Sequence, residues 1–173
     1  MIFLKFIQSL IKALHSEGTP GQVAAGFALG SILGLTPLMN LHNAFVFALI
    51  VLLNVSFPGA MLGWLICIPL GFIFDPLFDR LGAFLLVGIP DLRALWTEFF
   101  NTPVLALTNF NNTVVLGSVV ASVLLVAPLF FASRLGVVRY RATIGERVRQ
   151  SRFYRAITAS KAYNLYRLFR PGD

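Results

Sequence analysis

The feature that most constrains this chain is a long stretch without charged residues. Residues 18–74 contain no Asp, Glu, Lys or Arg, and His42 is the single histidine among them. One helix needs about 20 apolar residues to cross a bilayer core, so this stretch is too long for one crossing and long enough for three short ones. Only 12% of the whole chain is charged, whereas soluble proteins average about 25%. The sequence therefore predicts an integral membrane protein.

Prolines and polar residues divide the apolar sequence into short segments. Pro37 ends the first segment, because proline lacks a backbone donor and disfavours helix before it, and Asp75 with Pro76 is expected to end the third. Thr19 and Pro20 suit the N-cap and the first helical position of the first segment. We therefore expect an all-α membrane protein with about four short membrane helices, at residues 20–35, 41–53, 60–74 and 113–133.

Amphipathic segments flank this part of the chain. Residues 1–17 place apolar side chains at helical spacing, opposite Lys5 and Lys12, which predicts a helix lying in the membrane interface. Residues 134–173 hold ten basic and two acidic residues, whereas residues 1–133 hold four basic and five acidic ones. Since cytoplasmic segments are rich in Lys and Arg, we expect both termini in the cytoplasm. The predicted domains are an interfacial helix (1–17), a membrane domain (18–133) and a basic tail (134–173).

Basic and aromatic residues alternate in the tail, which favours a helix on the anionic inner leaflet, where each basic residue contributes about 1 kcal/mol. A docking site for a cytoplasmic protein is the alternative, and nucleic acid is not expected. The arginines predicted to bind anionic lipid are Arg139, Arg141, Arg147, Arg149, Arg152 and Arg155.

Three glycines four residues apart, Gly26, Gly30 and Gly34, line one face of the first segment. Such a small-xxx-small pattern lets a second helix approach closely. The alternative is a glycine face kept open for a lipid tail or a pore.

A polar break follows, with Thr36, Asn40, His42 and Asn43 between apolar segments. One interpretation is a tight interfacial turn in which Asn40 caps the next helix. The other is a re-entrant hairpin whose tip holds these side chains within the membrane, where helix N-terminal donors could meet a phosphate headgroup. Polar groups at membrane depth need a partner or a water-filled cavity, so either interpretation requires them to be satisfied.

Further polar candidates follow the next two apolar segments. Asn54 lies in one break, and Asp75 and Asp79 are four residues apart with Arg80 beside them. The acids either mark the membrane surface or form an acid–base pair or a weak cation site. The complete predicted set for lipid or solute binding is Thr36, Asn40, His42, Asn43, Asn54, Asp75, Asp79 and Arg80.

The glycine-rich run at residues 22–30, the Thr-Pro break at 33–43 and the Asp-Pro run at 74–82 also carry a resemblance. They resemble a family of small bacterial inner-membrane proteins catalogued as a domain of unknown function. The resemblance implies a multi-pass protein of the bacterial inner membrane. Fusion of some relatives to glycosyltransferases that use lipid carriers implies a link to envelope lipids, and the resemblance supplies no catalytic residues.

Three functions are consistent with these features. The first is a non-enzymatic component that transports or presents phospholipid or polyprenyl phosphate, with an envelope membrane protein as a partner. The second is an oligomeric channel for ions or small solutes, and the third is an anchor whose tail recruits a cytoplasmic protein. We expect no enzyme, cofactor or metal site, because the sequence lacks nucleophile, metal-ligand and phosphate-loop patterns. Cys67 is the single cysteine.

Overall fold

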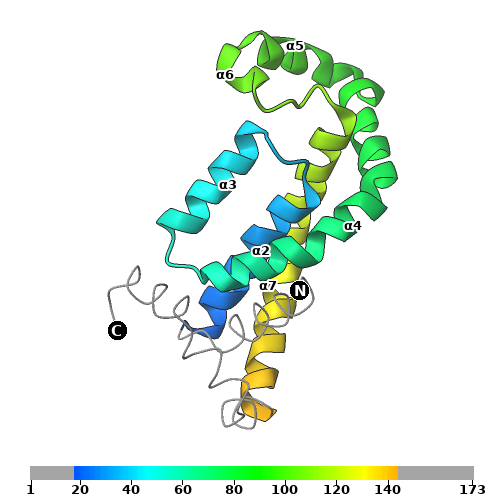
Figure 1. The fold of residues 1–173 in the computed structure, drawn as a ribbon. Coiled ribbons are helices and arrows are strands. Elements are labelled where there is room, and N and C mark those ends of the chain that lie inside the picture. The colour runs from blue at the N-terminus through cyan, green and yellow to red at the C-terminus, as the bar shows by residue number, and fades with distance from the viewer. Residues whose placement is uncertain (1–17, 144–173) are drawn as a thin grey trace.

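The computed structural model describes residues 18–143, and every regular element within that range is a helix (Figure 1). In chain order the elements are α2 (Pro20–Leu35), α3 (Leu41–Leu52), α4 (Phe57–Ala83), a π-helical turn η1 (Phe84–Gly88), a 3-10 turn η2 (Pro90–Leu92), α5 (Arg93–Asn101), α6 (Pro103–Ala106) and α7 (Thr113–Thr143). The helix expected at residues 1–17 and the predicted lipid-binding Arg147, Arg149, Arg152 and Arg155 lie outside the described residues.

Within residues 18–143, two helices, rather than the four expected, are long and apolar enough to cross a membrane. One is α4 with its π-helical extension, Phe57–Gly88 with 32 residues, and the other is α7 with 31 residues. By contrast, α2 and α3 have 16 and 12 residues, which corresponds to about 24 and 18 Å, less than the roughly 30 Å of a bilayer core. They form an antiparallel hairpin beside the two long helices.

The predicted helix end at Asp75 and Pro76 is wrong, because α4 continues through both residues to Ala83. Pro76 removes one backbone hydrogen bond, but the turns that follow it pack against α7. Phe78 and Gly82 are both buried there. The tertiary contact therefore overrides the local break.

The helix predicted at residues 113–133 likewise extends further, to Thr143. Val137 is buried in the added part, and Arg141 Nη1 donates a hydrogen bond to the Gly18 carbonyl at 3.0 Å. The end of α7 is thus tied to the chain just before α2. The predicted start of α2 is confirmed, with Thr19 as N-cap in a capping box with Gln22 and Pro20 at the first position.

The core consists of α2, α4 and α7, which pack against one another, whereas α3 contacts mainly α2 and lies apart from the two long helices α4 and α7 (Figure 1). Helices α2 and α4 run parallel. A Cβ atom added at Gly26 would lie 2.2 Å from the Ser56 carbonyl oxygen, and one at Gly30 would lie 1.9 Å from that of Ala60. Hence the two backbones touch where these glycines face α4.

Helix α4 also has glycines that face the backbones of α2 and α7. A Cβ at Gly63 would lie 2.1 Å from the Phe27 carbonyl oxygen of α2, and one at Gly82 would lie 1.8 Å from that of Thr113 in α7. Gly117 of α7 faces the Phe78 carbonyl oxygen in the same way, at 1.9 Å. The three helices therefore interlock through small residues on every core helix.

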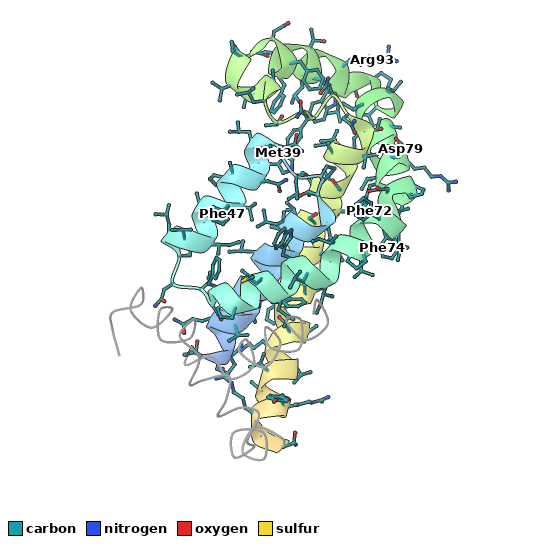
Figure 2. All side chains as sticks on the ribbon, in the orientation of Figure 1. Met39, Phe47, Phe72, Phe74, Asp79 and Arg93 are labelled. Atoms are coloured by element: carbon teal, nitrogen blue, oxygen red, sulfur yellow. The ribbon has the colours of Figure 1, made fainter. Side chains whose placement is uncertain are left out.

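The outward faces of the two long helices are covered with large apolar side chains. Phe72 and Phe74 of α4 are 75% and 44% exposed (Figure 2), and Leu124 and Phe131 of α7 are 70% and 62% exposed. A long helix in the core of a soluble protein is mostly buried, but only 33% and 28% of the most apolar windows of α4 and α7 are buried. This exposure is consistent with a membrane protein.

We expect Gly30→Ala to destabilise the protein by about 1–3 kcal/mol or more, because its methyl group would overlap the backbone of α4. The measurement is the thermal unfolding midpoint of the detergent-purified protein by circular dichroism. Gly136→Ala is the matched control, since nothing lies within 4 Å of a Cβ added there. Equal midpoints for both variants would contradict the interlocked packing.

Candidate functional site

The polar break between α2 and α3 forms the tip of the hairpin. Helix α2 ends at Leu35, and Met39 adopts a left-handed backbone with φ of 71° that turns the chain into α3. Asn40 occupies the N-cap position of α3, but its side chain makes no capping hydrogen bond. The prediction that Asn40 caps this helix is therefore wrong with respect to its side chain, which binds elsewhere.

The side chains of the tip satisfy one another. The Pro37 carbonyl accepts hydrogen bonds from Asn40 Nδ2 at 2.8 Å and from Asn43 Nδ2 at 2.6 Å. The Thr36 hydroxyl lies 2.8 Å from both the Ile32 carbonyl and Asn43 Oδ1, so its one proton serves either acceptor. Thr36, Asn40 and Asn43 are all buried. We call these three residues and Pro37 the amide cluster.

The connection between α6 and α7 covers the amide cluster. Asn109 donates a hydrogen bond from Nδ2 to Asn40 Oδ1, and the Leu41 amide donates to the Leu107 carbonyl at 3.2 Å. Asn109 has a left-handed backbone, with φ of 56°. The tip is thereby fixed to a segment about 70 residues later in the chain.

His42 does not join the amide cluster. Its ring lies 5.7 Å from that of Phe110, and both of its ring nitrogens are buried. Phe110 in turn stacks on Phe99 of α5 at 5.7 Å, and Phe99 contacts Trp96 at 6.0 Å. An aromatic row therefore joins α5 to the hairpin tip.

An apolar groove of about 440 Å³ starts at the amide cluster and runs between α3 and α4. We call it the tip groove. Asn40 and Asn43 line it with amide groups, and Trp64 lines it with an indole whose N–H is buried and has no hydrogen-bond partner among the described residues. Its other lining residues are Leu33, Leu38, Met39, Ala44, Phe47, Ile50, Phe57, Ala60 and Met61. Met39 is 96% exposed and Phe47 is 53% exposed (Figure 2), so the groove opens sideways onto the outer surface of the helices.

The remaining predicted site residues are distributed over the molecule. Asp75 is half-buried and lines a second groove together with Thr36. Asp79 accepts a hydrogen bond from the Thr113 hydroxyl, and Arg80 is exposed nearby on α4. Asn54 lies beyond the opposite end of α3. The structure thus brings Thr36, Asn40 and Asn43 together and separates Asn54, Asp79 and Arg80 from them.

Sequence reasoning did not include Asn109, although it completes the hydrogen bonding of Asn40. The run of three asparagines at positions 109, 111 and 112 is the available signal, because asparagine tolerates the left-handed backbone found at Asn109. Nothing in the sequence pairs that run with the Pro37 break.

We expect Asn43→Ala to lower the free energy of unfolding by about 1–3 kcal/mol, because it removes two hydrogen bonds, one with the buried Thr36 hydroxyl and one with the partly buried Pro37 carbonyl. Chemical or thermal denaturation of the detergent-purified protein measures this change. Asn111→Ala is the matched control, since Asn111 is exposed. A loss no larger than that of the control would contradict a structural role for the Asn43 amide.

Comparisons with known proteins agree with the resemblance seen in the sequence. A family model described as "Uncharacterized protein conserved in bacteria (DUF2062)" matches residues 4–144. An uncharacterized protein of Treponema pallidum (strain Nichols) is 27% identical over 154 residues, which cover 87% of this chain and 93% of that relative. No solved structure matches. The chain belongs to this family of conserved bacterial proteins.

Proposed function

We propose that this protein is a multi-pass protein of the bacterial inner membrane that binds an envelope lipid and transports or presents it, without catalysing a reaction. The observation that carries the proposal is the tip groove, an apolar groove of about 440 Å³ with two amide side chains at one end. An acyl chain fits its apolar walls, and a phosphate or ester group fits the amide end.

The sideways opening of the tip groove supports a lipid ligand. Phe57 and Met61 are 44% and 37% exposed on the α4 side, as Phe47 is on the α3 side. A lipid could therefore enter directly from the bilayer. Leaving the bilayer for an apolar groove brings an acyl chain little hydrophobic free energy, since lipid tails are already apolar. Polar contacts at the tip must therefore supply the preference for particular lipids.

The amides retain hydrogen-bonding capacity for such contacts. A carboxamide has two donor protons, and Asn40 and Asn43 each use one of theirs on the Pro37 carbonyl. Their remaining protons could bind a phosphate or ester oxygen. Both residues line the tip groove while their side chains stay largely buried, so the polar end is preformed.

The alternative function, a channel through one chain, is less well supported, because the interior of the three-helix core is tightly packed. Its fully buried Ser31, Ser118 and Ser122 hydroxyls donate to carbonyls of their own helices. Glycine and alanine fill the space between α2 and α4. Both grooves, of about 440 and 430 Å³, lie along the sides of the core.

Charge distribution supports the orientation that we propose. Arg139 and Arg141 lie at the end of α7 that is tied to Gly18, and the basic residues that follow would hold this end in the cytoplasm. The connection from η1 to α7 would then lie on the outer side. At the inner surface Arg139 and Arg141 would contact anionic headgroups. An envelope membrane protein as partner, or a second copy of the chain, belongs to the same proposal.

Cysteine labelling tests the orientation. In a Cys67→Ala background, we expect a cysteine replacing Asn111 to react with a membrane-impermeant maleimide from outside intact spheroplasts. A cysteine replacing Arg139 should react only in inverted vesicles, because positive segments stay inside. Both positions are exposed, so accessibility reports the side of the membrane. Labelling of both positions from one side would contradict a crossing by α7.

Filling the tip groove tests the function. We expect Ala44→Trp to abolish crosslinking of a photoreactive phospholipid in proteoliposomes, because Ala44 lines the groove and the indole would occupy it. Ala127→Trp is the matched control, since Ala127 is also exposed and lies on α7 outside the groove. Equal crosslinking of both variants, with unchanged thermal unfolding, would exclude the tip groove as the lipid site.

A further inference from the structure

A second groove, of about 430 Å³, lies on the other side of the hairpin tip. The last turn of α2 and the start of the break, residues 33–38, form one wall, and Ile68, Gly71, Phe72 and Asp75 of α4 form the other. We call it the Asp75 groove. It adjoins the tip groove, since Leu33 and Leu38 line both.

A carboxylate and the negative end of a helix dipole both lie at the Asp75 groove. Asp75 is half-buried in an apolar helix, and within residues 18–143 no side chain forms an ion pair or hydrogen bond with it. The groove also receives the C-terminus of α2, where the helix dipole is negative and no basic residue occupies the last turn. Arg80, five residues further along α4, is exposed.

Two backbone carbonyls beside this groove lack their regular helical donors because the donor positions, residues 37 and 76, are prolines. In a regular helix the carbonyl of residue 33 would accept from residue 37, but Pro37 has no N–H. The Phe72 carbonyl of α4 loses its regular donor in the same way, because residue 76 is proline. Both carbonyls belong to residues that line the Asp75 groove.

A backbone carbonyl without a donor and a carboxylate without a counter-ion both cost free energy within a bilayer. Membrane proteins keep such groups where they line a cavity or bind a ligand. In broken membrane helices, carbonyls at helix C-terminal ends commonly coordinate cations. We infer that the Asp75 groove binds a cationic group, with the Asp75 carboxylate as counter-ion and the backbone around Leu33 and Phe72 as further acceptors.

The size of the groove favours an ammonium group carried by a lipid. A single water takes up about 30 Å³, so 430 Å³ is far more than a bare ion needs. Its walls also offer Ile68 and Phe72 to the apolar part of a larger ligand. This inference deepens the proposed function, on which it rests for the lipid, and names the headgroup chemistry: an amine-bearing zwitterionic phospholipid. A free monovalent cation is the other source of the same charge.

The experiment compares headgroups in nanodiscs that contain equal amounts of phosphatidylethanolamine and phosphatidylglycerol. Native mass spectrometry measures the ratio of the two lipids retained by the full chain. We expect roughly tenfold enrichment of phosphatidylethanolamine, the effect of about one charge-assisted hydrogen bond. Asp75→Asn should remove the enrichment, and Asp75→Glu should keep it. Asp91→Asn is the matched control, because Asp91 is exposed on η2, outside both grooves.

A second arm measures binding of radioactive sodium to the lipid-free, detergent-solubilised protein by equilibrium dialysis. One outcome is that the wild type binds sodium, that Asp75→Asn abolishes this binding, and that no headgroup is enriched. It would support the cation site and show that its ligand is a free ion. The inference would be overturned if Asp75→Asn left both headgroup enrichment and sodium binding unchanged. It would also be overturned if the wild type showed neither. A wild type that retains no lipid but binds sodium through Asp75 would refute lipid handling alone.

Discussion

The structure depends on the direct contact of helix backbones between α2 and α4. Gly26 and Gly30 on one helix and Gly63 on the other leave no room for a Cβ atom, so the two helices approach as closely as backbones can. Close packing of this kind replaces the hydrophobic effect as a source of helix association in a bilayer. It also fixes α2, although that helix is too short to cross a membrane, beside the long helices α4 and α7.

That contact places the hairpin tip and creates the two grooves. Because α2 is held against α4 while α3 is not, space remains between α3 and α4. The amide cluster satisfies the chain where it reverses, and Asn109 secures the tip from the connection before α7. Asp75 lies one turn of α4 after Gly71, which packs against Gly34 at the end of α2, and it therefore lines the second groove beside that last turn.

Several elements were predictable because their causes are local. The capping box at Thr19 starts α2, and Pro37 ends it. The sequence also predicts a candidate site at the polar break, and three of its residues, Thr36, Asn40 and Asn43, lie together. The end of α4 was not predictable, because the packing of Phe78 and Gly82 against α7 outweighs the local effect of Pro76. Nor was the bond from Asn109 to Asn40, which joins residues 69 positions apart.

The sequence by itself determined the apolar character of the chain, its family and the positions at which helices can start, since these follow from composition, motifs and short-range backbone chemistry. Only the tertiary structure decided which helices are long, which side chains complete the amide cluster and where Asp75 lies. The physical reason is that burial and hydrogen bonding between distant segments can outweigh the preference of a single proline or asparagine. The grooves belong to this second group, because a cavity is the space that helix packing leaves unfilled.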